Sequence, residues 1–384
     1  MKQVIFFLVI YFLTGCSNKP KNLTAKNEKI NNEIKVEINH NIETVGIILI
    51  LSDLGDYVLK NYKGNEYSLI KLYRKEFKKF KQHPAVLKAN ELGKKDLLQF
   101  GYFYYGLSFN TLPEFKKIHK RFDEYYLSKK LSKEEIEIDL EKFDELIRKF
   151  YKDAKLNDFF LNHKIFYSQI KNEVKKSIPN NIISVMENYF KNYENEYIII
   201  PSPTIFTGWN FGPNIKGNNK TIFYYVTGPT DDINPKRNSI DEINKDDNLG
   251  FVDPDYYKEL AIHEFGHSFI RFIDKDRNKK LWESLSYLNN EQLKKNFERI
   301  GEGTEWNTVF EEHLVRANEI MIWKEMANEK MANEKLEYEK SQGILYIEDF
   351  VNALDKYRVN KENYKSFEAF FPELINNLKM IKKQ

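Results

Sequence analysis

The sequence lacks the means for internal disulfide bonding, because Cys16 is its only cysteine. It also lacks a strong charge of one sign: the formal net charge is +3, which gives no support to nucleic-acid binding, since that usually needs a concentrated basic face. The apolar run from Val4 to Phe12 is too short to span a bilayer as a helix. Of the 384 residues, 41% are hydrophobic, which is enough to form the core of one large domain or of two closely packed lobes.

The first residues have the character of a secretory signal. Lys2 supplies the positive start, the apolar run follows, and Leu13-Thr14-Gly15-Cys16 comes directly after it. A small-residue pair before a lone cysteine resembles the lipobox of bacterial lipoprotein signals, which implies cleavage before Cys16 and acylation of its thiol and amine. An ordinary signal peptide with a coincidental cysteine is the alternative. Because two or three acyl chains anchor stably, we expect a lipid-anchored protein of the bacterial cell envelope, at the outer membrane and facing the periplasm or the surface.

Composition then divides the chain into a tether and a folded body. Residues 1–15 are the expected signal peptide, and residues 16–35, rich in Asn, Lys and Glu, are the expected flexible tether. Residues 36–384 form the expected domain, with a helical N-terminal part over 36–196 and a catalytic part over 197–384. The predicted fold class is α+β, predominantly helical, with a small antiparallel sheet.

A few elements matter for the argument. Thr44 to Leu51 is a continuous apolar stretch that periodicity alone cannot assign, and it is either a buried strand or the start of a core helix. Strands are predicted at Ile198–Pro201 and Thr221–Thr227. A helix is predicted from Asp253, its N-cap, and Pro254, its first residue, to about Phe272.

The C-terminal third is predicted to be helical, over residues 280–299, 305–340, 347–358 and 367–382. Within it, Met326 to Lys330 is repeated verbatim as Met331 to Lys335. We interpret this duplication as a tolerated insertion in a polar helix and not as a functional repeat.

The chemistry is concentrated in His263-Glu264-Phe265-Gly266-His267, an H-E-x-x-H sequence inside the predicted helix. Residues four apart lie one above the other on a helix, so both imidazoles point the same way and can bind one Zn²⁺. Glu264 is placed to act on a metal-bound water without binding the metal itself. The alternative, two surface histidines on an ordinary helix, needs a coincidence in a chain with only seven histidines. The motif therefore predicts a zinc site with Glu264 as the catalytic base.

A catalytic zinc usually has three protein ligands and one open position. No histidine follows His267 closely, which excludes the longer pattern H-E-x-x-H-x-x-G-x-x-H, so we expect a carboxylate from a later helix. Glu312 is the first candidate, unless it only pairs with Arg316 on a solvated face. The other candidates for the third ligand are His313, Glu311, Glu302 and Glu305.

Much of the chain resembles the bacterial lipoprotein family named domain of unknown function 4932, a group with predicted zinc-peptidase chemistry. The resemblance covers VEINHNIETVGIILIL (36–51), HPAVLKANEL (83–92), NDFFLNHKIFY (157–167), GWNFGP (208–213), LAIHEFGHSF (260–269), EHLVRA (312–317) and the stretch 347–371. Only the H-E-x-x-H element and the element beginning at Glu312 carry chemical information. The resemblance implies a zincin-like, specifically gluzincin-like, site with Glu312 as third ligand, and it names no substrate.

One departure from better-known gluzincins concerns the residue four positions after the ligand Glu. Many have an Asp there, which steadies a zinc-bound histidine, whereas this chain has Arg316. We therefore expect another group, with Glu319 as a candidate, to orient His263. Arg316 either holds Glu312 or stabilises the oxyanion as a catalytic residue; Tyr224 and Tyr346 are the alternative oxyanion donors.

The predicted function is that of a membrane-anchored zinc metallopeptidase whose Glu264 activates a zinc-bound water. The expected partners are a peptide or protein substrate and membrane lipid through acylated Cys16, with no nucleic acid, and the expected state is a monomer. We expect an extended substrate to add to the strand Thr221–Thr227, unless that strand is simple sheet structure. Two alternatives remain: an inactive surface lipoprotein that binds peptide or glycan, which leaves Glu264 unexplained, and a zinc hydrolase of cell-wall amide bonds.

Overall fold

The computed structural model describes residues 33–381, apart from 62–68, 96, 98–101, 120–130, 180, 194 and 218–219. These residues belong to one compact unit. The predicted signal peptide, Cys16 and all but the last residues of the predicted tether lie outside the described residues. Within the described part of the chain, no helix is both long and apolar enough to cross a membrane.

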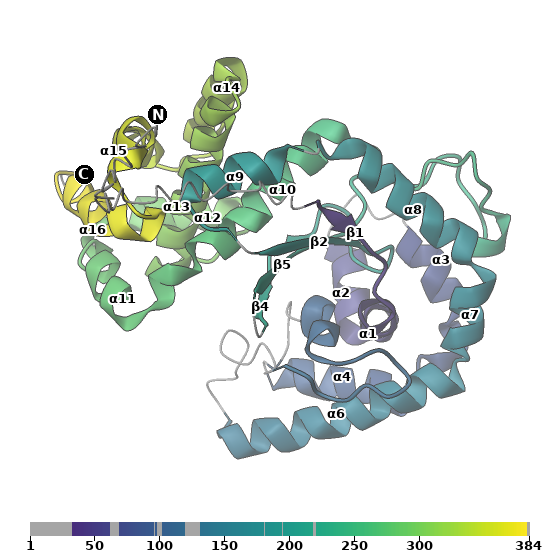
Figure 1. The fold of residues 1–384 in the computed structure, drawn as a ribbon. Coiled ribbons are helices and arrows are strands. Elements are labelled where there is room, and N and C mark those ends of the chain that lie inside the picture. The colour runs from purple at the N-terminus through teal and green to yellow at the C-terminus, as the bar shows by residue number, and fades with distance from the viewer. Residues whose placement is uncertain are drawn as a thin grey trace, which may run out of the picture. The chain divides into compact units, whose positions relative to one another are not determined.

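Helix α1 (His40–Leu51) is the centre of the N-terminal half, so the apolar stretch is a core helix and not a strand. Every residue from Asn41 to Leu51 is buried, as expected of a helix that is apolar on most of its surface. Asn39 caps the first turn, where its side chain accepts hydrogen bonds from the backbone N–H groups of Asn41 and Ile42. Around it lie α2 (Asp53–Asn61), α3 (Leu69–Glu76), α4 (Pro84–Lys94), α5 (Tyr102–Tyr105) and α6 (Lys133–Asp153) (Figure 1).

Helix α1 carries one carboxylate into this core, that of Glu43, which is fully buried. Burial raises the pKa of Glu43 from its ordinary 4.5 to about 8, and the nearby Ser202 hydroxyl offsets only part of this shift. The hydroxyls of Tyr73 and Tyr167 lie 2.6 Å apart in the same region, and burial, with a smaller contribution from the Glu43 carboxyl, raises the pKa of both. The folded protein therefore holds Glu43 protonated at neutral pH.

This gives a pH-dependent contribution to stability. Between about pH 4.5 and 8 the unfolded chain loses the Glu43 proton while the folded chain keeps it, so the free energy of unfolding falls by up to about 1.4 kcal/mol per pH unit. Replacing Glu43 with Gln removes this term, so the variant should match wild type near pH 4.5 and exceed it in stability at pH 8. Urea unfolding of both proteins across this range measures the difference, and parallel curves would contradict the prediction.

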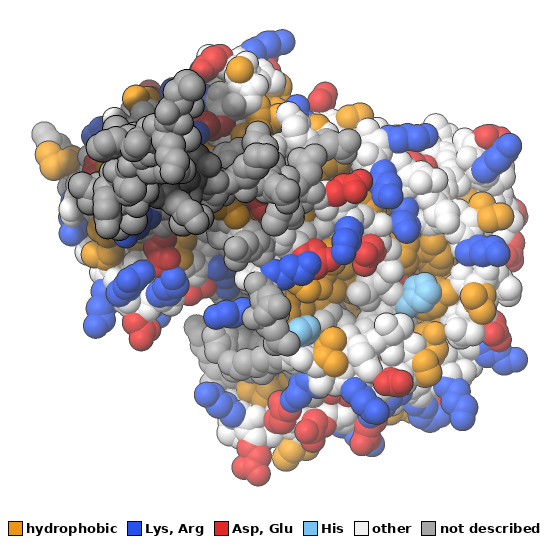
Figure 2. Space-filling model, viewed as in Figure 1, with side chains coloured by type: hydrophobic (Ala, Val, Ile, Leu, Met, Phe, Trp, Pro, Cys, Tyr) orange, Lys and Arg blue, Asp and Glu red, His pale blue; other side chains and the backbone are white. Residues whose placement is uncertain are grey.

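Helices α7 (Leu156–Asn162), α8 (Lys164–Ser177) and α9 (Ile182–Phe190) lead from this group to the sheet (Figure 1). On the face in Figure 2, the Lys, Arg, Asp and Glu side chains drawn in colour are interspersed, which agrees with the nearly balanced charge of the chain.

The sheet is mixed, so the prediction of an antiparallel sheet was wrong. Its strands are β1 (Lys35–Val36), β2 (Glu196–Pro201), β3 (Asn210–Phe211), β4 (Asn214–Lys216) and β5 (Thr221–Thr227). β1, β2 and β5 are parallel neighbours, whereas β3 and β4 run antiparallel to β5. The reason is that the chain reverses twice between β2 and β5, and the segment between the reversals takes the antiparallel place. β5 is consequently an internal strand, with β3 and β4 at one edge of the sheet and β1 at the other.

Helix α10 (Pro254–Ile270) carries the H-E-x-x-H sequence and begins as predicted. Asp253 caps it by accepting a hydrogen bond from the backbone N–H of Tyr256, and Pro254 is its first residue. One face packs on the sheet, where Phe265 lies edge-on to Tyr197, with 5.4 Å between ring centroids. The helix continues into a 3₁₀ turn at Arg271–Asp274.

The C-terminal helices are α11 (Asp276–Glu283), α12 (Glu291–Arg299), α13 (Trp306–Glu325), α14 (Glu329–Ser341), α15 (Ile347–Asn360) and α16 (Phe367–Leu378). The predicted helix over 305–340 is two helices, because Ala327 adopts a left-handed conformation (φ 54°) and Asn328 caps α14. The two copies of the duplicated sequence therefore differ in structure: the first contains this break, and the second lies within α14. α13 packs against α10, α14 and α15, which makes it the central helix of this region (Figure 1).

Candidate metal centre

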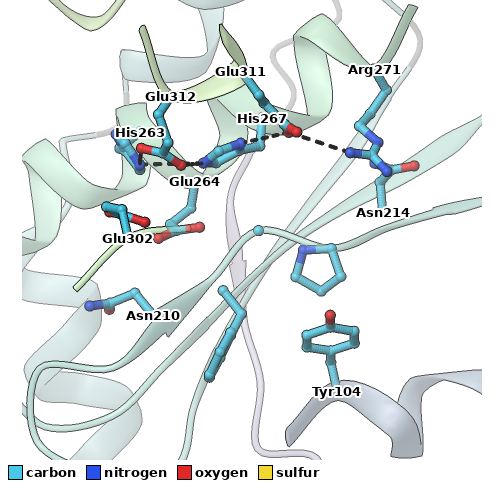
Figure 3. A pocket seen from close by; sticks show the side chains of 13 residues that line it. Tyr104, Asn210, Asn214, His263, Glu264, His267, Arg271, Glu302, Glu311 and Glu312 are labelled. Atoms are coloured by element: carbon cyan, nitrogen blue, oxygen red, sulfur yellow. Dashed lines mark hydrogen bonds and ion pairs between the residues drawn. The ribbon is translucent and has the colours of Figure 1, made fainter. Parts of the chain in front are cut away.

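The site lies where α10 and α13 face each other. His263 and His267 are one turn apart on α10, and their Nε2 atoms are 3.3 Å from each other. Glu312 reaches them from α13, with Oε2 3.7 Å from His263 Nε2 and Oε1 3.4 Å from His267 Nε2. Figure 3 shows the three side chains converging on one point at the wall of the cavity. These three residues lie close enough to hold a metal ion, and they are the one such group found among the described residues.

The remaining nitrogen of each histidine faces a carboxylate. His267 Nδ1 is 3.0 Å from Glu311 Oε1, and His263 Nδ1 is 3.6 Å from Glu319 Oε2. Such carboxylates fix the orientation of metal-binding imidazoles and raise their basicity. Glu319 was the sequence-based candidate for this role toward His263, whereas Glu311 was considered only as a ligand. Adjacent helical residues point about 100° apart, which lets the neighbours Glu311 and Glu312 reach different nitrogens of one imidazole.

Electrostatics at the site are dominated by buried carboxylates. Burial raises the pKa of Glu312, but its hydrogen bond with His267 and the charge of Arg316 outweigh burial and hold this pKa well below its ordinary range. Burial opposes the protonation of His267, yet hydrogen bonds to Glu311 and Glu312 raise its pKa well above the ordinary value. Glu312 is therefore ionised, and its negative charge favours a cation beside it.

Arg316 contacts Glu312 but does not itself line the cavity. Its guanidinium donates to Glu312 Oε2 at 3.1 Å, to Glu302 Oε1 at 2.9 Å and to Glu339 Oε2 at 3.1 Å. Three carboxylates thus occupy the three nitrogens of one largely buried arginine, and Arg316 is absent from the cavity lining. The contact with Glu312 agrees with the first of the two roles considered, and the oxyanion role stays a prediction.

Helix α14 supplies the outermost charges of the same network. Lys335 lies 3.1 Å from Glu319, 3.3 Å from Glu339 and 2.8 Å from Glu259. Lys335 ends the second copy of the duplicated sequence, whereas Lys330, which ends the first copy, has a side chain that is 83% exposed. The second copy therefore contributes to the support of the site, which the interpretation as a tolerated insertion did not anticipate.

The cavity beside the three residues has a volume of about 450 Å³. Glu264 lines it and is buried, and burial raises its pKa. Across from α10 runs the sheet edge, with Asn210 to Asn214 lining the cavity (Figure 3). Gly212 permits this approach, because a Cβ atom there would lie 2.3 Å from Glu264 O and 2.9 Å from Glu264 Oε2.

The other sequence-based candidates differ in where they lie. His313 is buried between Phe297 and Phe350, its Nδ1 is 2.6 Å from Val309 O, and burial lowers its pKa to about 4. Glu302 lines the cavity, and burial together with the charge of Glu312 raises its pKa to about 7. Three further candidates do not line the cavity: Glu305, Tyr224 and Tyr346.

Sequence reasoning missed seven lining residues, of which four have polar side chains: Tyr104, Asn210, Asn214 and Arg271. Arg271 carried a usable signal, since it follows His267 by four residues and so continues the stripe of the two histidines. Tyr104 carried none, because α5 reaches the cavity only through tertiary packing; its ring lies edge-on to Phe211 with 5.8 Å between centroids.

Comparison with known proteins adds a family and no activity. Neither the curated proteins nor the solved structures include a significant match. A family model described as a domain of unknown function (DUF4932) matches residues 34–377, which span the sheet, α10, α13 and all three candidate ligands. The chain belongs to the DUF4932 family.

Proposed function

We propose that the protein is a zinc-dependent peptidase with a gluzincin-like site. The observation that carries this proposal is the convergence of His263 Nε2, His267 Nε2 and the Glu312 carboxylate beside a cavity that Glu264 also lines. A purely structural metal site is usually closed by four protein ligands, whereas a catalytic one keeps a position open. Three ligands facing a cavity, with a further carboxylate beside them, favour the catalytic kind.

The spacing of the ligand atoms supports zinc. An ion bound tetrahedrally at about 2.0–2.1 Å requires ligand atoms about 3.3–3.4 Å apart. The two imidazole Nε2 atoms are 3.3 Å apart, Glu312 Oε1 lies 3.4 Å from His267 Nε2, and the other carboxylate oxygen, Oε2, lies 3.7 Å from His263 Nε2. Two imidazole nitrogens and one carboxylate oxygen are also a donor set that suits zinc, whereas Mg²⁺ and Ca²⁺ take oxygen ligands.

In the proposed mechanism, bound zinc supplies Lewis acidity that lowers the pKa of water and polarises the substrate carbonyl. Glu264 accepts the proton of the attacking water and then delivers it to the leaving amine. Its burial favours this second step, because a raised pKa stabilises the protonated carboxyl between the two transfers. The imidazoles keep their orientation through Glu311 and Glu319, and Arg316 holds Glu312. Tyr104, which lines the cavity, replaces Arg316, Tyr224 and Tyr346 as our candidate donor to the carbonyl oxygen.

We place the substrate along β3 and β4, which changes the earlier expectation for Thr221–Thr227. β5 is paired on both sides, so its backbone has no free edge for another chain. The edge segment from Asn210 to Asn214 lines the cavity instead, and an extended peptide can add to it. Membrane anchoring through acylated Cys16, and the monomeric state, remain parts of the proposal that rest on the sequence alone.

The test combines zinc content with cleavage of a random peptide library, for the purified full-length chain and its Glu264→Gln variant. Both proteins should bind about one zinc, because Glu264 is not a ligand, whereas cleavage should fall by about 10²–10⁴-fold in the variant, which lacks the base. Equal cleavage by both proteins would exclude the mechanism. Zinc binding without cleavage by wild type would favour a binding lipoprotein, or a hydrolase of other amides.

A further inference from the structure

The cavity at the metal centre meets a second one, which extends along β4. The second cavity has a volume of about 480 Å³, and Arg271 and Asn214 line both. Lys216, also on β4, lines the second cavity and continues the same sheet edge. The two cavities together form an extended groove, which we call the edge groove, between the sheet edge and the end of α10. A groove that continues past the metal centre suits a chain substrate better than a small molecule.

Charge changes sign along the edge groove. The metal end is lined by four carboxylates, those of Glu264, Glu302, Glu311 and Glu312. The far end is lined by four cations and one carboxylate: Lys191, Lys216, Arg271, Lys275 and Glu368. Some of these cations have acidic neighbours, since Lys275 pairs with Glu368 and Lys191 with Glu362. Lys216 forms no ion pair with any described residue, so the far end keeps a positive potential that attracts anions.

Arg271 lies at the junction of the two cavities. It is one helical turn beyond His267, a rise of about 6 Å, and an extended peptide covers that distance in about two residues. Glu311 Oε1 lies 3.0 Å from His267 Nδ1 and 3.4 Å from Arg271 Nη1, so one carboxylate fixes both side chains. Asp274 contacts the guanidinium at Nε, 3.2 Å away, and the side chain remains 30% exposed. A substrate can therefore reach this guanidinium from the groove.

We propose that the edge groove selects substrates with a carboxylate about two residues from the scissile bond, on the Arg271 side. Arginine binds carboxylates through paired hydrogen bonds, and Lys216 adds charge farther along the edge. The carboxylate belongs either to an acidic side chain or to the C-terminus of the substrate. This inference rests on the proposed function, because it takes the metal centre as the point of cleavage.

The experiment compares peptide libraries that fix Glu or Gln at one position from three residues before to three after the cleavage site. Wild type should cleave the Glu library at least about tenfold faster at one position, about two residues to one side, and not at the mirror position. Free and amidated C-termini, compared on the same peptides, separate a side-chain carboxylate from a terminal one. The Arg271→Met variant should bring the Glu-to-Gln ratio close to one. Lys220→Met serves as the control and should keep the ratio, because Lys220 pairs with Glu196 and does not line the groove.

A binding measurement separates this inference from the proposed function. Labelled Glu and Gln peptides are titrated into the zinc-loaded Glu264→Gln variant, with and without Arg271→Met, so no cleavage is needed. If the Glu peptide binds more tightly than the Gln peptide, and Arg271→Met removes the difference, the inference is supported. If wild type then cleaves no peptide, only the proposed function fails. Cleavage by wild type with equal rates for Glu and Gln libraries and for both C-terminal forms overturns the inference alone. Equal binding of the Glu and Gln peptides together with equal binding of their free and amidated C-terminal forms, or no binding of any of them, also overturns it.

Discussion

Replacing His263 or Glu312 with alanine is expected to reduce zinc binding from about one equivalent to nearly none. Each variant leaves two of the three converging ligand atoms, and a carboxylate or imidazole lost from a three-ligand site has no substitute within the distances described. Metal content after dialysis against a weak chelator measures the effect. A second readout is thermal unfolding with and without zinc: at a thousandfold excess over the dissociation constant, zinc should stabilise wild type by about 4 kcal/mol and the variants by almost nothing.

Glu305→Ala is the matched control for Glu312→Ala. Glu305 precedes the first turn of α13, its side chain makes no capping hydrogen bond, and it does not line the metal cavity. This variant should bind zinc like wild type. If Glu312→Ala instead kept a full equivalent of zinc, the third ligand would have to be another carboxylate of the cavity, and Glu302 would be the first to replace.

Replacing Arg316 with Met is expected to cause a large loss of stability. The arginine is the common partner of Glu302, Glu312 and Glu339, and Glu339 is fully buried. Removing one partner of a buried ion pair leaves uncompensated charge and costs about 3–5 kcal/mol. We expect a loss of this size in the free energy of unfolding, measured by urea denaturation in the presence of a strong chelator so that metal binding does not contribute.

Arg277→Met is the control, since the Arg277 side chain is 71% exposed and pairs with Glu368 at the surface. Pairs of this kind contribute about 0–1 kcal/mol. A loss below about 1 kcal/mol for Arg316→Met would mean that water reaches the three carboxylates. Arg316 would then be accessible enough to return as a candidate for the oxyanion.

The parts of the site that were predicted from the sequence depend on local geometry. His263, Glu264 and His267 lie within two turns of one helix, and the start of that helix at Asp253 and Pro254 is encoded beside it. Glu312 is far away in the chain, and its assignment needed the resemblance to a family as well as the expectation of a third ligand. Tyr104 and Asn214 reach the cavity through tertiary packing, for which one sequence has no local signal.

The predictions that were wrong also have physical explanations. The prediction of an antiparallel sheet was wrong because the direction of pairing depends on how many times the chain reverses between two strands. The short segments β3 and β4 also have little strand character of their own. The predicted helix over 305–340 seemed continuous because each copy of the duplicated sequence has good helix formers. The left-handed Ala327 and the cap at Asn328 interrupt it. The buried role of Arg316 was open in the sequence, because an arginine one turn after a glutamate is equally compatible with a solvated pair.

Because α10 and α13 face each other at the site, a bound metal ion would also help to hold the fold together. A metal ion bound by His267 and Glu312 would join two helices whose adjoining residues His267 and Glu311 are 44 positions apart. Joining distant residues reduces the freedom of the unfolded chain and makes folding more favourable. The chain has no second cysteine with which to make such a cross-link covalently. The ion would therefore act as a removable cross-link between α10 and α13, so that the stability of this part of the fold would depend on metal supply.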